Sequence, residues 1–362
     1  VYTNTGNQND LDRIMRLTRA VLNTPNLSQS FKKSEIDIVK REVYYKERNA
    51  PSRWLNRLAL QKLYGSKFGR AETPVSDLNK LTVNAAMDFH DKHYIPSNSM
   101  LIISGNINES LAQKKLSQYF GDTIKTKRIE DKWLKQRPDK GLESITKIST
   151  NRLMDDQLSY AKFFRFNDLS DILGMQASFF IASDIYNSHL NNALYLDGNT
   201  AQSFSQSSYI AVNGDIEYTA SLIPFEGFTL EEAYENLKIA IKNLESINIT
   251  HKEIETARSK NVAYTKSLSQ SPRAYLDFFQ NLGSDGLPPV SPTEFSKMIA
   301  RAPVEDILKI ISAFATDSPS AVILAPPVWL LSTDGRDTRP IKTRNGRIRR
   351  NPLAITLMAN CQ

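Results

Sequence analysis

The chain has 362 residues, of which 40% are apolar and 23% are charged. This composition is typical of one large or two smaller globular domains, and no apolar run approaches the roughly 18 residues of a membrane span. The single cysteine, Cys361, excludes a disulfide framework and a thiolate metal cluster. No basic segment followed by an apolar stretch comes after Val1, so we expect processing or truncation to have set this terminus.

The net charge of +7 is concentrated in residues 328–362. This tail holds seven basic residues against two acidic ones, a net charge of +5 that leaves +2 for the rest of the chain. It has neither helical nor strand periodicity, so we expect it to be disordered. Its sequence character differs from that of the rest of the chain, which suggests a read-through or out-of-frame extension. A basic segment indicates phosphate contacts only when a fold presents it, which argues against nucleic-acid binding.

Helical periodicity dominates the first 120 residues. Apolar residues recur at helical spacing in residues 10–22. Ser34, with Asp37 at the third position, is expected to cap the next helix, Pro51 to begin another, and Thr82 to cap a fourth. We predict helices over residues 10–22, from residue 34, and over residues 51–64, 82–93 and 110–120, with a buried strand over residues 100–107.

A charged stretch over residues 125–143 has the composition of a solvated linker, and both strands and helices follow it. We predict strands over residues 144–149, 157–166, 202–211, 218–223 and 320–326, and helices over residues 168–189, 230–244, 250–268, 271–282 and 304–314. Strands beside long helices, without strict alternation, predict an α+β fold.

An internal repeat relates the two parts of the chain. Residues from Lys252 onward match residues from Ser34 onward, so that Glu253 falls on Glu35, and Pro272 lies near the place of Pro51. The order helix, capped helix, helix, helix, strand occurs twice, about 220 residues apart. We therefore predict a duplicated α+β unit. Its parts are a first subdomain (1–124), the linker (125–143), a second subdomain (144–327) and the basic tail (328–362).

The first copy of the unit is incomplete. The second copy has some 80 residues of strand, helix and strand before its matching helix, whereas the first has fewer than ten. The core exposed by the missing strands predicts poor solubility or association with a complementing chain.

Glu35 and Glu42 stand seven residues apart, which brings them within about 20° on one helix face. The opposite number of Glu42 in the second copy is Lys260, so the shared fold does not need this carboxylate. Two interpretations stay open. The pair belongs to a solvated acidic face beside the basic residues of its helix, or Glu42 is a metal ligand and Glu35 a carboxylate behind it that orients a ligand or water.

Five motifs together resemble the insulinase, or pitrilysin (peptidase M16), family of inverted-motif zinc metallopeptidases. They are the Glu-x6-Glu helix, the Leu-Tyr-Gly-x-x-x-Gly turn, the Leu-Thr capped helix, the Tyr-x-Pro-x-Asn turn and the Ile-Ile-Ser-Gly-Asn-Ile strand end. The resemblance covers residues 1 to about 327, more weakly after Gly141, and includes the duplicated unit.

The resemblance implies a zinc metalloendopeptidase in which Glu42 is the third zinc ligand and Glu35 is its companion. In the family a His-x-x-Glu-His helix supplies two ligands and the general base, and a zinc-activated water attacks the peptide bond. The resemblance also implies that a peptide or unfolded polypeptide binds as an added strand. A second M16-like subunit is an expected partner. The compartment, periplasmic or cytoplasmic, stays open.

The chain departs from the family because His-x-x-Glu-His occurs nowhere in it, so the general base is missing. Its four histidines are His90, His93, His189 and His251. His90 and His93 share a helix face, but we interpret them as helix-end residues and not as ligands. His189 is expected to end a helix, and His251 to sit in a capping box after Thr250, so we interpret both as structural.

Three hypotheses follow. The chain is a fragment of a zinc endopeptidase, a non-catalytic scaffold subunit that partners an active peptidase, or a binding protein that acts through its basic tail. Retention of Glu35 and Glu42 favours the first, because a long-inactive subunit has no reason to keep a ligand. We expect the 362-residue chain alone not to hydrolyse peptides and to bind zinc weakly at best.

Overall fold

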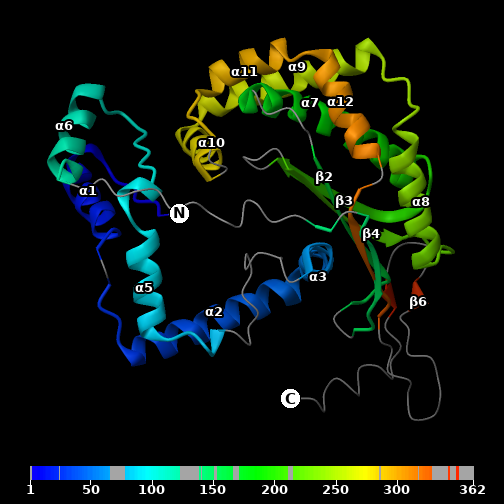
Figure 1. The fold of residues 1–362 in the computed structure, drawn as a ribbon, viewed down its shortest axis with the longest axis horizontal. Helices are drawn as coiled ribbons and strands as arrows, with labels where there is room; N and C mark the ends of the chain where they lie inside the picture. Colours follow the sequence, from blue (N-terminus) through cyan, green and yellow to red (C-terminus); the bar gives the residue numbers. More distant parts are fainter. Residues whose placement is uncertain are drawn as a thin grey trace.

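The structure is a computed structural model with helices throughout and one five-stranded sheet (Figure 1). It describes residues 2–23, 25–65, 78–122, 138–139, 141–150, 153–165, 171–210, 215–284, 287–316, 318–327, 341–342 and 348–349. The predicted α+β class is confirmed. No helix among these residues is both long and apolar enough to cross a membrane.

Helices make up the first part of the chain. They are α1 (Leu11–Ala20), α2 (Gln29–Asn49), α3 (Pro51–Tyr64), α5 (Val83–His93) and α6 (Glu109–Phe120), with short 3-10 turns at Gln8–Asp10 and Pro96–Asn98. Local signals set several starts: Pro51 occupies the first position of α3, and the Thr82 hydroxyl accepts a hydrogen bond from the Ala85 amide. Lys115 and Tyr119 of α6 both donate to Asp12 of α1, which joins these two helices.

Two predictions for this part are wrong. Ser34 does not cap a helix: α2 begins at Gln29, and the Ser34 hydroxyl donates to the Ser30 carbonyl inside it. Residues 100–107 do not form a strand, and Met100 and Leu101 are 49% and 37% exposed. An apolar run becomes a strand only beside a partner strand, and the described part of residues 2–122 contains none.

The second part is built on a mixed sheet in the order β1-β5-β2-β4-β3. Its strands are β1 (Glu143–Lys147), β2 (Gln157–Arg165), β3 (Ala201–Ile210), β4 (Asp215–Pro224) and β5 (Ser320–Ala325). β1 runs parallel to β5, and the other neighbours are antiparallel, with Ser159 of β2 opposite Ser221 of β4. All five strands fall where the sequence predicts them.

All but one of the helices of the second part also begin and end near the predicted residues. They are α7 (Ile172–Asn191), α8 (Leu230–Asn243), α9 (His251–Ser267), α10 (Pro272–Ser284), α11 (Pro292–Arg301) and α12 (Val304–Ala315), with a π-helical turn at Asn192–Leu196 and a 3-10 turn at Leu268–Gln270. Helix α11 is not among the predicted helices, although Ser291 and Glu294 form a capping box at its start.

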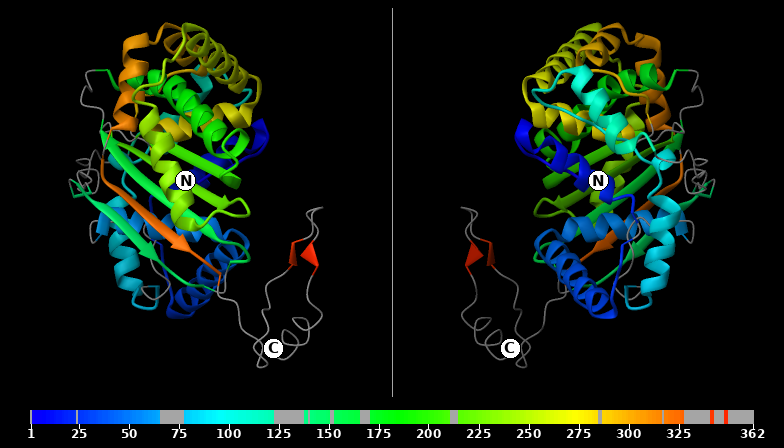
Figure 2. Two further views of the ribbon diagram at one scale, coloured as in Figure 1. Left: turned by 90° about the vertical axis from the view of Figure 1, so that its right-hand side faces the viewer. Right: turned by 90° about the vertical axis from the view of Figure 1, so that its left-hand side faces the viewer.

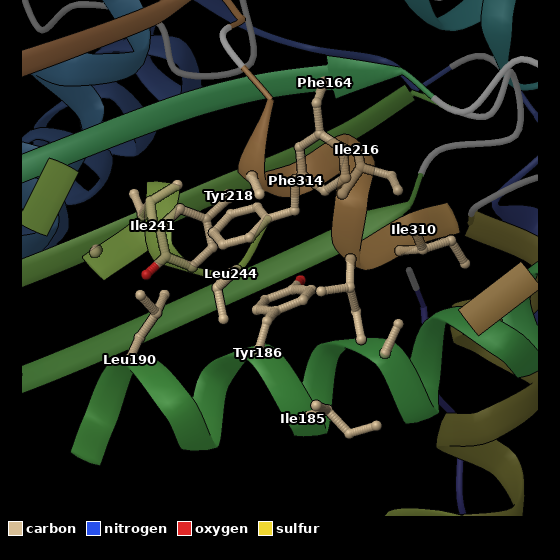
Figure 3. Close-up of a cluster of buried hydrophobic side chains, with 14 of the residues drawn as sticks. Phe164, Ile185, Tyr186, Leu190, Ile216, Tyr218, Ile241, Leu244, Ile310 and Phe314 are labelled. Carbon is tan, nitrogen blue, oxygen red and sulfur yellow. The ribbon is translucent and has the colours of Figure 1, made fainter. Parts of the chain in front are cut away.

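The main core lies between one face of the sheet and the helices α7, α8, α9, α11 and α12. Its centre is a group of aromatic rings (Figure 3), in which Tyr186 of α7 stacks on Phe314 of α12 with ring centroids 4.3 Å apart and Tyr218 of β4 meets Phe314 edge-on. The Tyr186 hydroxyl hydrogen-bonds Ser208, and that of Tyr218 donates to Gln206. The buried phenols are therefore satisfied.

The opposite face of the sheet is covered by α3, a helix from the first part (Figures 1 and 2). Leu55, Ala59 and Leu63 are at most 1% exposed and pack on a second apolar cluster of the sheet. The Asn56 side-chain oxygen accepts hydrogen bonds from the hydroxyls of Ser159 and Ser221. Helix α3 is thus tied to the sheet by both apolar and polar contacts.

A matching contact in the first half (the predicted subdomain 1–124) and in the second half (the predicted subdomain 144–327) supports the duplication. In the second half Arg258 of α9 pairs with Glu255 and donates to the Ala302 carbonyl, just before α12. At the equivalent place Lys40 of α2 lies 3.9 Å from Asp37 and donates to Asn79, just before α5. Both halves therefore tie the long helix to the segment that precedes the next matching helix.

Several predictions lie largely or wholly outside the described residues. These are the Gly-x-x-x-Gly part of the predicted turn after Tyr64, most of the linker over residues 125–143 and most of the basic tail. Within the tail, β6 (Ile341–Lys342) and β7 (Ile348–Arg349) form a short antiparallel pair.

Candidate functional site

Glu35 and Glu42 lie on one exposed face of α2. The Glu42 carboxylate is 2.5 Å from the ammonium group of Lys46, one helical turn later. Other sides of α2 are exposed as well, since Tyr44 is 55% exposed and Tyr45 is 71% exposed. Taken alone, the helix presents a solvated acidic face with an i,i+4 ion pair, the plainer of the two interpretations.

The second half shows what the same helix face does when it is covered. Helix α9 packs on α7, and Glu253, the equivalent of Glu35, lies 3.0 Å from the imidazole of His189. Lys260, the equivalent of Glu42, lies 2.5 Å from Asp184 of α7. The two positions therefore face a neighbouring helix, and both contact its polar side chains.

Glu253 has a second role at the start of α9. It accepts hydrogen bonds from the hydroxyl and the amide of Thr250, in the capping box that the sequence predicts. The Thr250 hydrogen bonds, with a smaller contribution from His189, lower the pKa of the Glu253 carboxyl. His189 itself lies near the end of α7 and His251 begins α9, so both occupy structural positions.

Comparison of the two halves indicates which element the Glu35–Glu42 face would contact. If α2 were covered as α9 is, these carboxylates would point at a helix equivalent to α7. No such helix occurs among the described residues of 2–122. Glu253 and Lys260 are seven residues apart and share a helix face. Asp184 and His189 are five apart, and no local spacing pairs them with α9, so only packing shows that the two pairs meet.

His90 and His93 take part in packing contacts at the end of α5. The His90 ring stacks on Tyr94 with centroids 4.3 Å apart, and its Nε2 lies 2.9 Å from the Val21 carbonyl oxygen. The His93 ring stacks on Phe89, also at 4.3 Å. These contacts fit helix-end residues and bring neither imidazole to Glu42.

A zinc ion does not fit the side chains that the structure brings together. Protein zinc sites need three or four nitrogen, sulfur or oxygen ligands at about 2.0–2.3 Å. Within the described part of the chain, no group of three or more histidine, cysteine, aspartate or glutamate residues could hold a metal ion. Glu42 supplies one carboxylate and pairs with Lys46. The described residues therefore do not form a zinc site by themselves.

Comparisons with known proteins agree with this architecture. A sequence family described as "Peptidase M16 inactive domain" matches residues 80–261, half of the chain. The chain therefore belongs to the peptidase M16 family, and its fold is that of an M16-like peptidase. A search of curated proteins found no match.

Solved structures of M16-like proteins share the fold. The first half of the periplasmic protease PqqL from Escherichia coli is 13% identical with a TM-score of 0.65, covering 90% of this chain and 72% of that one. A peptidase M16 inactive domain from Pseudomonas fluorescens is 14% identical with a TM-score of 0.69, covering 89% and 76%.

The ferredoxin protease FusC, solved as a mutant in complex with Arabidopsis ferredoxin, is 16% identical with a TM-score of 0.59. The match covers 97% of this chain but 39% of that one. These likenesses are all below 17% identity, and they define the fold alone.

Proposed function

We propose that this chain is part of a zinc metalloendopeptidase, to which it contributes Glu42 as a zinc ligand and Glu35 as the carboxylate that orients the site. The observation that carries the proposal is the helix face that the two residues share. Its equivalent in the second half, Glu253 and Lys260, contacts His189 and Asp184 of α7. A helix placed against α2 in the same way would bring its side chains to Glu35 and Glu42.

The difference between Glu42 and Lys260, which occupy equivalent positions in the two halves, supports a metal-binding role for Glu42. In the second half a lysine at this position forms an ion pair with Asp184, which needs no metal. A carboxylate in its place is a zinc ligand type. Membership of the M16 family supports zinc as the metal and a peptide or unfolded polypeptide as the substrate. The general base and the imidazole ligands would come from a helix outside these 362 residues.

The isolated chain gives the first test. We expect it not to hydrolyse a quenched fluorescent peptide, and to bind zinc weakly at best in equilibrium dialysis, because one carboxylate does not hold the ion. Tight stoichiometric zinc binding that Glu42→Ala abolishes would contradict this expectation and would require ligands such as His90 and His93 to rearrange.

The assembled protein gives the decisive test. The chain is purified, with whatever it binds, from the cells that produce it, and zinc content and peptide hydrolysis are measured. We expect Glu42→Gln to remove most of the zinc and to lower kcat by at least about a hundredfold, because a neutral amide is a poor replacement for an anionic ligand. Asp37→Asn is the matched control, because this exposed carboxylate lies on the opposite side of α2.

A non-catalytic scaffold subunit is the second candidate, because the matched family is described as an inactive domain. The same preparation separates the two functions. Zinc content and hydrolysis that are unchanged by Glu42→Gln would show that the site lies wholly in another chain, and would leave this chain the scaffold role.

A further inference from the structure

Three exposed apolar side chains lie at one end of the second-half sheet, where β3 begins and β4 ends. Tyr195 and Leu196 of the π-helical turn are 44% and 57% exposed, and Phe225, directly after β4, is 48% exposed. The amide of Phe225 donates to the carbonyl of Thr200, directly before β3, so the two segments lie side by side. We call Tyr195, Leu196 and Phe225 the end patch.

An ordered turn presents two of these side chains to solvent. Leu194 is 1% exposed and anchors the π-helical turn in the main core. The Asp197 amide donates to the Asn192 carbonyl and closes the turn. The two side chains that follow Leu194 are therefore held outward by the backbone, and π-helical turns of this kind are frequent at functional sites.

The segments that carry the end patch are acidic. Residues 191–206 and 224–237 contain five acidic residues and no lysine, arginine or histidine. Two of the five form ion pairs with lysines of β1 and α8. The other three are exposed: Asp197, Glu226 and Glu232. A polypeptide that covers this surface therefore needs both apolar and basic side chains.

Strand β5 leads into the basic tail at this same end of the sheet. Ala325, the last residue of β5, lies opposite Gln157 of β2. The next residue of β2, Leu158, lies opposite Leu222 near the end of β4. The ends of β5 and β4 are thus two strand spacings apart, about 10 Å. The tail therefore leaves the sheet close to the end patch.

Residues 341–350 of the tail have the complementary chemistry. They contain five basic residues, no acidic residue and two isoleucines. In the short pair of β6 and β7, Ile341 lies opposite Arg349 and Lys342 lies opposite Ile348. Because opposite residues share a face of an antiparallel pair, each face carries one isoleucine and one basic side chain. Figure 2 shows β6 and β7 apart from the second-half sheet.

We propose that residues 341–350 close on the end patch of the same chain as a tethered, salt-sensitive strap. An isoleucine packs on Tyr195, Leu196 and Phe225, and the basic side chains face the three exposed carboxylates. The intervening residues 328–340 reach far enough, because thirteen residues span up to about 43 Å when extended. Surface ion pairs contribute little one by one, but tethering raises the effective concentration to the millimolar range, so a weak contact suffices.

The strap is independent of the proposed peptidase function. It rests on the charge of residues 341–350, on the exposed side chains of the end patch and on the place where β5 ends. It therefore holds whether or not Glu42 binds zinc, and whatever the origin of the tail.

Photo-crosslinking tests the strap on the full chain, purified from the cells that produce it. A photoreactive amino acid replaces Leu196 in one variant and Tyr264, 57% exposed on α9, in a control variant. Light and heavy isotope-labelled chains are mixed, and crosslinked peptides are identified by mass spectrometry. We expect Leu196 to crosslink to residues 341–350 of the same chain, with a yield at least about fivefold lower in about 1 M salt, which screens the charges. Tyr264 should not crosslink to that segment.

Charge reversal within the tail gives a matched comparison. We expect Arg347→Glu with Arg349→Glu to lower the yield of the Leu196 crosslink at least about fivefold, because attraction to the carboxylates becomes repulsion. Arg336→Glu with Arg339→Glu is the control. It changes the net charge of the tail by the same amount outside residues 341–350, and it should leave the yield unchanged.

Tryptic cleavage gives an independent measurement. We expect Glu226→Lys to speed cleavage after Arg347 at least about threefold, because the variant raises the population of the undocked, cleavable segment. Glu305→Lys, which reverses an exposed charge on α12, is the control and should leave the rate unchanged.

Several results would overturn the strap. They are the absence of a crosslink from Leu196 to residues 341–350, a yield that neither salt nor charge reversal changes, and equal cleavage rates in Glu226→Lys and the unaltered chain. Crosslinks only between light and heavy chains would make the occupant a second copy, and crosslinks to another polypeptide would make it an external partner. Either result would also exclude docking within one chain.

Discussion

Asn56 shows how one polar side chain can join the two halves of the molecule. Its side-chain oxygen accepts from Ser159, which is fully buried, and from Ser221, which is 8% exposed. Removing a shared acceptor leaves buried hydroxyls without that partner, and this costs more than the bonds themselves contribute. The contact should therefore matter for the docking of α3 on the sheet.

We expect Asn56→Ala to lower the free energy of unfolding by about 2 kcal/mol, because Ser159 and Ser221 both lose their acceptor. Urea unfolding followed by circular dichroism measures the change. Lys62→Ala is the control, because Lys62 lies on the exposed side of α3. If both variants unfolded at the same urea concentration, the hydrogen bonds would not be what holds α3 in place.

Two buried tyrosines give the second half a dependence on high pH. Burial raises the pKa of Tyr218 well above its usual range, with smaller contributions from Tyr186 and Tyr160, and burial also raises the pKa of Tyr186. The folded form then keeps protons that the unfolded chain loses near pH 10. Stability from these phenols is fully present below about pH 10 and is lost as the pH rises toward the folded-state values.

We expect the free energy of unfolding to fall above about pH 10 by roughly 1.4 kcal/mol per pH unit for each phenol concerned. Tyr218→Phe should make this fall shallower while it leaves the aromatic packing on Phe314 in place. Urea unfolding at pH 9, 10 and 11 gives the slopes. An identical slope in the variant would mean that Tyr218 ionises without unfolding the chain.

Among the elements, α11 depends on an arginine from α9. Arg258 is 9% exposed and donates to the carbonyls of Ile299, Ala300 and Ala302, at and just after the C-terminus of α11. The last carbonyls of a helix have no partner within it, so the guanidinium both satisfies them and complements the helix dipole. The contact also positions the start of α12.

We expect Arg258→Met to lower the free energy of unfolding by about 3 kcal/mol, because the buried carbonyls lose a charged donor. Arg273→Met removes an exposed i,i+4 ion pair with Asp277 and should cost less than about 1 kcal/mol. Thermal unfolding of the two variants side by side measures the difference. Equal melting temperatures would show that water replaces the Arg258 contact.

The segment over residues 100–107 shows why element prediction can fail where the local pattern is right. Its apolar run resembles that of β5, which occupies the equivalent position in the repeat and forms a strand. A strand is stable only when neighbouring strands accept its hydrogen bonds. Local sequence cannot report whether those neighbours are present.

At the scale of the whole molecule, stability is expected to be uneven. Helix α7 buries many apolar residues and α9 buries Ile254 and Ala257, whereas α5 buries only Val83. Local opening requires less free energy where fewer apolar contacts break. The isolated chain should therefore open first in its first half.

We expect amides of α2 and α5 to exchange with solvent on the order of a hundredfold faster than those of α7 and α9 in the isolated chain. Hydrogen exchange with mass spectrometry measures the rates by segment. Helix α3 is an internal control: it belongs to the first half but should exchange slowly, because it is buried on the sheet. Uniform protection of all these helices would contradict the uneven core.

The α+β class, the strands and all helices but α11 in the second half, the capping box at Thr250 and the internal repeat could be read from the sequence alone, because these depend on residue spacing and on side chains within a few positions. The sequence also singled out Glu42 as a carboxylate that the repeat does not require. Tertiary structure decided the rest. Only packing put α3 on the far face of the second-half sheet and paired Lys260 with Asp184. Packing also left residues 101–104 without a partner strand among the residues that the structure describes. These contacts join residues distant in the chain, and no local pattern specifies which surfaces meet.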